Sequence, residues 1–326
     1  MPKRNISDIS HLIDEDLKHF NEQFKHSLKS KVAIVDLITR YILKQKGKKV
    51  RPLLVLLSSK IAGGVSERSY RGAILVELLH TATLVHDDVV DSAETRRSFP
   101  SINAVWKNKI AVLMGDYLLA RGLMQAVDGS DFDFLKVITN TVKRMSEGEL
   151  LQTSKTRKLN NDEETYFRII SDKTASLLST CCEVGARAAT VDENKINAMK
   201  EYGENLGIAF QIRDDILDLV GSKTLLGKPL GGDIKEKKIT LPLIYALKNS
   251  SSDNAKSVIK TMKQSESKID VNYVIEFVKK NGGIEYADKV AKEYSSKAIQ
   301  NLSIFENSEY KSALEDLALF VVERTK

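Results

Sequence analysis

The pattern Asp-Asp-x-x-Asp occurs twice in the chain, and it is the feature best suited to chemistry. Its six carboxylates belong to Asp87, Asp88, Asp91, Asp214, Asp215 and Asp218. On a helix, residues four apart share a face, and like charges one turn apart repel each other. A solvated acidic turn or a helix cap could explain a single copy. It explains two copies poorly, because apolar residues flank both of them. Clustered oxygen ligands favour Mg²⁺, which commonly bridges carboxylates to substrate phosphates.

Basic residues near both copies are suited to bind such phosphates. The segment 47–52 (GKKVRP) is expected to begin a helix, where free backbone N–H groups and the helix dipole favour anions. An Arg-Arg pair follows the first copy, a Lys-Thr pair lies inside an apolar helical stretch, and two lysines follow the second copy in a Gly-rich region. These residues are Lys48, Arg51, Arg96, Arg97, Lys173, Thr174, Lys228 and Lys238. For any one of them alone, a solvated basic face is the alternative interpretation.

The elements that would position these residues are predicted to be helices. Prolines occur at positions 2, 52, 100, 229 and 242, so the interval 101–228 is free of them and can hold several long helices. Apolar residues recur at helical spacing over residues 32–43, 69–90, 105–127, 132–151, 166–189 and 198–220. Shorter helices are expected after residue 241, with Gly282 and Gly283 separating two of them. We predict a single all-α domain spanning residues 1–326.

The composition of the chain excludes several classes of protein. The 326 residues are 42% hydrophobic and 29% charged, with a net charge of +6, which is typical neither of a disordered chain nor of a membrane bundle. No run reaches the roughly 18 uncharged apolar residues of a membrane-spanning helix. The two cysteines, Cys181 and Cys182, cannot build a disulfide framework, which favours a reducing compartment. A nucleic-acid partner would explain the charge but not the aspartates, so none is expected.

A series of segments resembles the trans-isoprenyl diphosphate synthases of the polyprenyl synthetase family. In chain order, between residues 47 and 243, these segments are GKKVRP, LLHTATLVHDDVVDSAETRR, GDYLLAR, DKTASL, FQIRDDILD, GKPLGGD and TLPLIYAL. The resemblance implies a bundle of antiparallel helices around a deep central cavity, with the aspartate motifs facing each other across its mouth. It also implies isopentenyl diphosphate and an allylic diphosphate as substrates, a cluster of about three Mg²⁺ ions, a homodimer and a cytoplasmic location.

The same resemblance assigns roles to individual residues. The six aspartates would hold Mg²⁺ on the allylic diphosphate, and the residues expected to be catalytic are Asp87, Asp88, Asp91, Asp214, Asp215 and Lys173. Contacts to the allylic substrate are expected from Arg96, Lys173, Thr174, Gln211, Lys228 and Lys238. The isopentenyl diphosphate site is expected to comprise Lys48, Arg51, His80 and Arg97. The family usually has Gly where this chain has Lys237, so the phosphate contact is expected from either Lys237 or Lys238.

Small residues before the first motif bear on product length. Ala82 and Thr83 occupy positions where, in the family, bulky aromatics close the tunnel that receives the growing product. Leu79 lies one turn deeper, and Met124 is one candidate on the facing helix for the end of the tunnel. The segment HTATLVHDDVVD resembles bacterial long-chain enzymes of quinone biosynthesis, which implies an octaprenyl product released at a membrane surface or to a carrier. A geranylgeranyl diphosphate synthase and a non-catalytic subunit of a heteromeric synthase are the alternatives.

Overall fold

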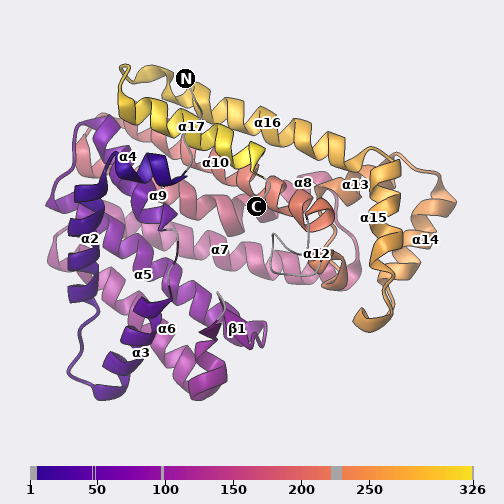
Figure 1. Cartoon of the computed structure of the whole chain (residues 1–326), viewed down its shortest axis with the longest axis horizontal. Helices are drawn as coiled ribbons and strands as arrows, with labels where there is room; N and C mark the ends of the chain where they lie inside the picture. The colour runs from indigo at the N-terminus through magenta and orange to yellow at the C-terminus, as the bar shows by residue number, and fades with distance from the viewer. Residues whose placement is uncertain (1–5, 46, 48, 97–98, 222–229, 325–326) are drawn as a thin grey trace.

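Helices form nearly all of the described structure. The computed structural model describes residues 6–45, 47, 49–96, 99–221 and 230–324, and Figure 1 shows its long helices lying side by side. The helices of the first half are α1 (Ile6–His11), α2 (Asp14–Ser27), α3 (Ala33–Lys44), α4 (Val50–Ala62), α5 (Glu67–Val90), α6 (Ile102–Asp128) and α7 (Phe132–Lys158). Those of the second half are α8 (Glu163–Ile170), α9 (Ser176–Ala189), α10 (Glu193–Val220), α12 (Gly232–Lys235), α13 (Leu241–Lys248), α14 (Ser252–Met262), α15 (Val271–Lys280), α16 (Gly283–Asn301) and α17 (Glu309–Glu323). The all-α prediction is confirmed.

The helices that carry the two aspartate motifs run through the core. α5 packs against α6, α4 and α9, and α10 packs against α16 and α9. Leu75 and Leu79 of α5 and Ile208 and Ile212 of α10 are buried in the same apolar cluster. Burying one such side chain contributes about 1.5–3 kcal/mol. The positions of both motifs are therefore fixed by the packing of their own helices.

The helical stretch predicted at 166–189 contains a change of helix type. α8 is followed without a break by the π-helix η1 (Ser171–Ala175), and η1 continues directly into α9. Two short 3₁₀ turns, η2 (Glu266–Lys268) and η3 (Leu302–Ile304), occur near the C-terminus. π-Helical turns are rare and frequently lie at functional sites. In this chain the π-turn contains Lys173 and Thr174, both predicted site residues.

A short β-ribbon follows α5. Its strands, β1 (Thr95–Arg96) and β2 (Phe99–Pro100), pair antiparallel, with Thr95 opposite Pro100 and Arg96 opposite Phe99. The Tyr41 hydroxyl of α3 donates a hydrogen bond of 2.7 Å to the carbonyl oxygen of Pro100. The ribbon turns the chain back, so that Arg96 lies beside the end of α5.

The C-terminal helices cover α10. α16 lies along α10, and α17 packs on both helices, as Figure 1 shows in yellow. The predicted break at Gly282 and Gly283 is confirmed, because α15 ends at Lys280 and Gly282 adopts a φ of 70° before α16 begins. Such a left-handed φ is readily available to glycine. α17 brings Arg324 against α10, where its guanidinium lies over the Phe210 ring, 4.1 Å from the centroid.

The two cysteines lie on α9 and are free thiols. Both Cys181 and Cys182 have a relative exposure of 0%. Burial raises the pKa of Cys182 to about 12 and raises that of Cys181 well above its ordinary value. Because the thiolate is the reactive form of cysteine, both side chains are inert in the folded protein.

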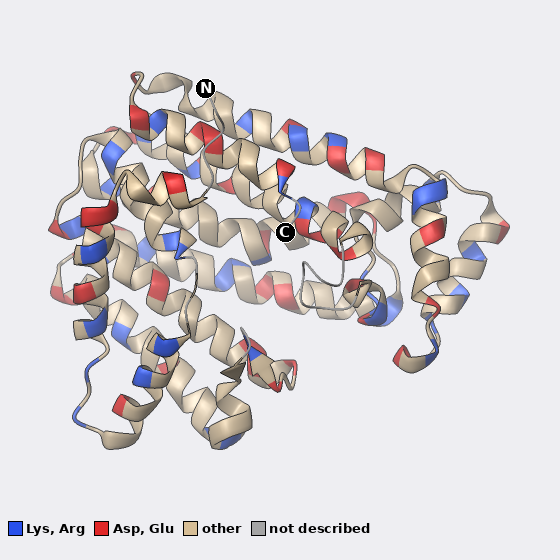
Figure 2. Cartoon of the chain, viewed as in Figure 1, with Lys and Arg blue, Asp and Glu red and all other residues tan. Residues whose placement is uncertain are grey.

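The outer face of α6 is unusually apolar. α6 is long and apolar enough to cross a membrane by length and composition alone, although its inner face, with Met114 and Leu118, is buried against the rest of the bundle. Its outer face exposes large apolar side chains, those of Val105, Val112, Leu113, Met124 and Val127. Elsewhere in the view of Figure 2, acidic and basic residues are interspersed along the helices.

Candidate active site

The first aspartate motif lies at the C-terminal end of α5. Asp88 is only 3% exposed, and its Oδ1 accepts a hydrogen bond of 2.6 Å from Nε of Arg96. Burial raises the pKa of Asp87, the charges of Glu149 and Asp91 raise it further, and Lys173 and Arg96 oppose this rise. The C-terminal end of a helix carries partial negative charge. Three carboxylates at this place therefore favour the binding of a cation.

The second motif occupies the last turns of α10, and its carboxylates accept hydrogen bonds from several parts of the chain. Asp215 is 3% exposed and accepts bonds from the Tyr166 hydroxyl (2.6 Å) and from Nε2 of Gln211 (2.9 Å). Asp218 accepts bonds from the backbone N–H groups of Gly232 and Asp233. Asp214 pairs with Arg324, whose Nη2 lies 2.6 Å from its Oδ1. Each carboxylate is thus held by groups of the protein itself.

Burial is the main influence on the carboxyl groups of the second motif, and neighbouring carboxylates add to it. Burial raises the pKa of Asp214 and Asp218, and burial together with the charge of Asp233 raises that of Asp215 well above its ordinary value. Burial, with help from Asp218, raises the pKa of Asp233 to about 6, although Lys238 opposes this rise. The positive charges of Arg324 and Lys238 thus offset the effect of burial only in part.

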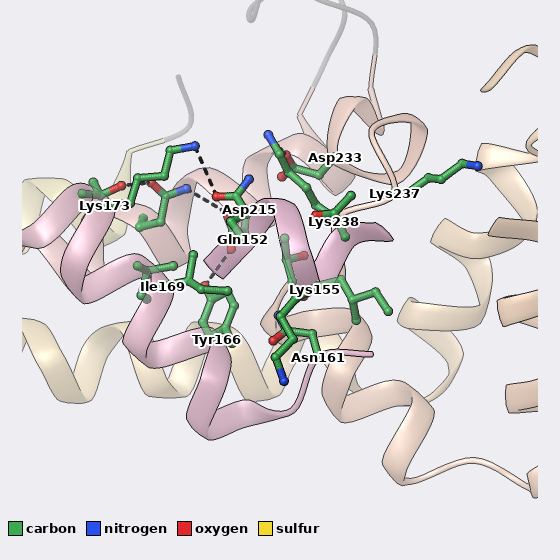
Figure 3. Close-up of a pocket in the computed structure, with 16 residues that line it drawn as sticks. Gln152, Lys155, Asn161, Tyr166, Ile169, Lys173, Asp215, Asp233, Lys237 and Lys238 are labelled. Carbon is green, nitrogen blue, oxygen red and sulfur yellow. Dashed lines mark hydrogen bonds and ion pairs between the residues drawn. The ribbon is translucent and has the colours of Figure 1, made fainter. Parts of the chain in front are cut away.

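A pocket lies between α7, α8, η1, α10 and the segment around α12. It encloses about 110 Å³, and Figure 3 shows its lining. The predicted site residues that line it are Lys173, Thr174, Gln211, Asp215, Lys237 and Lys238. The structure thus brings together residues that are far apart in the sequence, and it gives the pocket both acidic and basic walls.

Lys173 connects the two sides of this region. Its Nζ lies 2.5 Å from Oε2 of Glu149 and 3.2 Å from Oε1 of Gln152, both on α7. Its charge also acts on Asp87 of the first motif. On the other side, the charge of Asp91 helps to raise the pKa of Lys238. Both motifs and both lysines therefore share one mouth.

Lys237 and Lys238, the two candidates for one phosphate contact, both line the pocket but have different surroundings. Nζ of Lys238 lies 2.5 Å from Glu236 and 3.7 Å from Asp233. Burial would lower the pKa of Lys238, but these carboxylates raise it overall, so the side chain stays charged. In Figure 3 the Lys237 side chain extends away from the other labelled residues. Lys238 is therefore the one of the two whose ammonium lies among the acidic side chains of the pocket.

A second pocket lies beside the first motif. It is lined by Asp88 and His80 of α5, by Arg96 and by residues that lead into α4, including Gln45 and Lys49. His80 is 7% exposed. Burial lowers the pKa of Lys49, and Nζ of Lys49 donates to Oδ1 of Asn21. Two cations, a buried imidazole and two carboxylates, those of Asp88 and Glu77, thus line one small cavity.

Three of the predicted phosphate-binding residues, Lys48, Arg97 and Lys228, fall outside the described residues. Arg51 lies in the first turn of α4, and its charge acts on Cys181. It does not line the second pocket.

The proposed chain-length residues divide into two groups. Ala82 and Leu79 are 1% and 2% exposed and belong to the core, and the Thr83 hydroxyl donates to the carbonyl oxygen of His80. Met124, by contrast, is 47% exposed on the outer face of α6. The role of Met124 at the end of the tunnel stays a prediction, and in the single chain its side chain lies on a different side of α6 from the buried Leu118.

Sequence reasoning missed residues that line the pocket or pair with the residues that line it. Asp233 lines it, and its backbone N–H donates to Asp218. Glu149 pairs with Lys173, and Tyr166 donates to Asp215. The GKPLGGD segment that ends in Asp233 is the one signal that could have identified any of them, because a carboxylate after two glycines in a loop next to a metal motif is a candidate ligand.

The residues present suit a divalent cation. Within the described part of the chain, no three His, Cys, Asp or Glu side chains already converge on a single point. The donors around the mouth are nonetheless carboxylates, as hard cations such as Mg²⁺ and Ca²⁺ prefer. The raised pKa values of Asp87, Asp214, Asp215 and Asp218 mark a site where added positive charge is favourable. The donor set therefore fits a hard divalent metal shared between the two motifs.

Comparisons with known proteins agree with this geometry. The sequence pattern of the polyprenyl synthetase family matches residues 32–278. The chain is 34% identical to a geranylgeranyl diphosphate synthase of Saccharolobus solfataricus, over 98% of this chain and 99% of the relative. It is 32% identical to an octaprenyl diphosphate synthase of Haemophilus influenzae, over 98% and 97% of the two chains. A crystal structure of a polyprenyl synthase from Caulobacter crescentus, complexed with calcium and isoprenyl diphosphate, matches with a TM-score of 0.90 at 33% identity and covers 100% of both chains.

The fold is that of the prenyl synthases of known structure. The chain belongs to the polyprenyl synthetase family. Members of this family are prenyltransferases that use a divalent metal, and this chain is a trans-prenyl diphosphate synthase that condenses isopentenyl diphosphate. The relatives include synthases of short and long products, so similarity alone leaves product length undetermined.

Proposed function

We propose that the enzyme extends farnesyl or geranylgeranyl diphosphate to a long all-trans product, about octaprenyl diphosphate, for a quinone side chain. The observation that carries this proposal is Ala82, a small residue that is 1% exposed on α5, little more than one helical turn before Asp87. A methyl side chain leaves space where a ring would stop a growing prenyl tail. The residues one turn deeper, Leu78 and Leu79, are apolar and match the chemistry of that tail.

The catalytic power would come from charge around the diphosphate. Bound to the two aspartate motifs, Mg²⁺ would neutralise the diphosphate and stabilise the charge that develops as it leaves. Lys173 and Lys238 add positive charge at the same mouth, in fixed positions. When the allylic C–O bond breaks, the isopentenyl double bond attacks the resulting cation, and the released diphosphate accepts the proton. No side-chain nucleophile is needed.

Residues inside the pocket would orient the reacting groups. The Thr174 hydroxyl donates to Oε1 of Gln211 (2.9 Å), and the amide nitrogen of Gln211 donates to Asp215. This chain of hydrogen bonds leaves oxygen atoms beside the place where the allylic cation forms. His80 and Arg96 line the second pocket, which is the proposed site of isopentenyl diphosphate, and Lys49 is a further cation there.

We further propose a cytoplasmic homodimer in which the outer face of α6 is buried between two copies. Exposed apolar patches of this kind commonly mark protein interfaces, and two-fold dimers are the most frequent oligomers. Leu113 and Met124 are 55% and 47% exposed in the single chain. The free, buried thiols of Cys181 and Cys182 are compatible with a reducing compartment.

Product analysis tests the chain-length proposal directly. The purified enzyme is incubated with farnesyl diphosphate, radiolabelled isopentenyl diphosphate and Mg²⁺, and the dephosphorylated products are separated by reversed-phase chromatography. A ladder that ends near octaprenol supports the proposal. A ladder that ends at geranylgeraniol keeps the reaction but rejects the long product. No incorporation would favour a non-catalytic subunit, although the chain retains both aspartate motifs.

Substitution of the aspartates tests the metal assignment. Asp87→Ala and Asp214→Ala each remove one carboxylate from the mouth, and turnover should fall by at least ~100-fold while circular dichroism and thermal unfolding stay close to wild type. Asp253→Ala is the matched control, since Asp253 is 96% exposed on α14. Near-native turnover of either variant, with an unchanged Mg²⁺ requirement, would contradict the assignment of its motif.

A further inference from the structure

The π-helix η1 requires a structural explanation of its own. It is five residues long and lies between two ordinary α-helices. A π-turn contains more residues than an α-turn and packs less well along its axis. It is therefore expected where contacts from neighbouring groups stabilise it. Lys173 and Thr174 belong to this turn and line the main pocket. Whatever holds η1 therefore also sets the direction of these two side chains.

A buried ionic cluster contacts η1 on the side that does not face the pocket. Arg144 of α7 donates from Nε to Oδ1 of Asp172 (2.8 Å) and from Nη2 to the Ser171 hydroxyl (2.8 Å). The same Nη2 lies 2.8 Å from Oε1 of Glu204 on α10. The Ser171 hydroxyl in turn donates to Glu204. One guanidinium thus joins α7, η1 and α10.

The side chains of this cluster are largely withdrawn from water. Their relative exposures are 25% for Arg144, 17% for Asp172 and 24% for Glu204. Burial would lower the pKa of Arg144, but its hydrogen bonds with Glu204 and Asp172 raise it, so the guanidinium stays charged. Partly buried charge pairs with several hydrogen bonds specify one arrangement of the groups that they join.

Two glycines let the neighbouring helices approach η1 closely. A Cβ at Gly148 of α7 would lie 3.0 Å from Cβ of Asp172 and 3.0 Å from the backbone nitrogen of Lys173. A Cβ at Gly207 of α10 would lie 2.5 Å from Cα of Ala175. Both glycines lie between the ionic cluster and the pocket residues Gln152 and Gln211 of the same helices. Close packing and the cluster therefore act on η1 together.

We propose that Arg144, with Glu204, is a positioning residue that holds η1 in its π-turn and so directs Lys173 and Thr174 into the pocket. Arg144 binds the first two residues of the turn, and the next two residues carry the functional groups. Loss of the extra residue of a π-turn would rotate the following side chains by about 100° around the helix axis. The inference rests on the proposed role of Lys173 at the allylic diphosphate.

A comparison of variants separates positioning from simple stability. Arg144→Gln removes the charge and the forked hydrogen bonds, and kcat should fall by about 10- to 100-fold, the range expected when catalytic groups are misplaced. KM for isopentenyl diphosphate should stay within about twofold, because no residue of the cluster lines the second pocket. Arg187→Gln is the matched control, since Arg187 is 21% exposed and also bridges two carboxylates, those of Glu183 and Glu193. It should leave kcat unchanged.

The decisive measurement places Arg144→Gln in a chain that already carries Lys173→Ala and Thr174→Ala. If Arg144 acts through these two side chains, its replacement should cost less than about threefold there, because coupled residues are not additive. If Arg144→Gln lowers kcat in the Lys173→Ala and Thr174→Ala background as much as it does in wild type, the proposal is overturned. If Lys173→Ala alone keeps near-native turnover, that result rejects the proposed role of Lys173 at the allylic diphosphate, on which the inference about Arg144 rests.

Stability is followed for every variant by thermal unfolding. If Arg144→Gln does not fold, Glu204→Gln replaces it in the same cycle, since the amide preserves the shape and one acceptor of the carboxylate. Loss of kcat in Glu204→Gln, absent in the Lys173→Ala and Thr174→Ala background, supports positioning. An equal loss in both backgrounds contradicts it.

Discussion

Replacement of Asp233 by Asn should stabilise the metal-free enzyme, although it removes a pocket residue. Burial and the neighbouring carboxylates raise the pKa of Asp233 from 3.8 to about 6. One pKa unit corresponds to about 1.4 kcal/mol, so the charged form costs the folded protein about 3 kcal/mol relative to the unfolded chain. The folded state holds the proton more tightly, so this term favours folding fully below about pH 4 and is lost as the pH rises to about 6.

The assay is urea unfolding in the presence of a chelator, at pH 4 and at about pH 7.5. Asp233→Asn cannot ionise, so it should match wild type at pH 4 and exceed its free energy of unfolding by up to about 3 kcal/mol at pH 7.5. Lys238 retains Glu236 as a partner in this variant. The control Asp253→Asn, on an exposed helix, should change stability at neither pH.

In the second part of the experiment, unfolding is measured with Mg²⁺ in place of the chelator. Added Mg²⁺ should stabilise wild type more than Asp233→Asn at pH 7.5, because a ligand that binds only the folded state adds its binding free energy to stability. If the variant has the same stability difference from wild type at both pH values, the ionisation of Asp233 is not the cause. If it is less stable at pH 7.5, the reasoning about crowded carboxylates is refuted.

Three further predictions concern other parts of the enzyme. Ala82→Phe should shorten the product to about three or four isoprene units, because a ring at this position would block the proposed tunnel beside α5; an unchanged product ladder would contradict the tunnel. Arg324→Gln removes the partner of Asp214 and should tighten Mg²⁺ binding several-fold in calorimetric titrations, whereas weaker binding would show that Arg324 supports the site. Leu113→Glu should convert the proposed dimer to a monomer in light scattering, and a monomeric wild type would reject that interface.

The helices were predictable because they combine two independent signals. Apolar spacing predicted helices at α5 and α10, and the resemblance to the polyprenyl synthetase family implied that their aspartate motifs face each other. Lys173 could be selected as a site residue from the resemblance to the polyprenyl synthetase family. Its surroundings could not, because the groups that contact η1 come from α7 and α10, which are distant from it in the sequence.

Residues that act through distant partners were beyond sequence reasoning. Arg324 and Asp214 pair across more than a hundred residues, and nothing in either local segment indicates the contact. Asp233 follows a glycine pair in a loop, so helical spacing does not apply to it. Met124 was selected for its apolar character, which does not distinguish the buried face of α6 from the exposed face on which it lies.

The burial of both cysteines has a practical consequence for spectroscopy. The chain contains only Cys181 and Cys182, and neither presents a thiolate to a maleimide dye while the protein is folded. A cysteine introduced at Glu94, an exposed position next to β1, would therefore be labelled selectively without prior removal of native thiols. A fluorophore at that position would lie near the first aspartate motif and report the arrival of metal and diphosphate in real time.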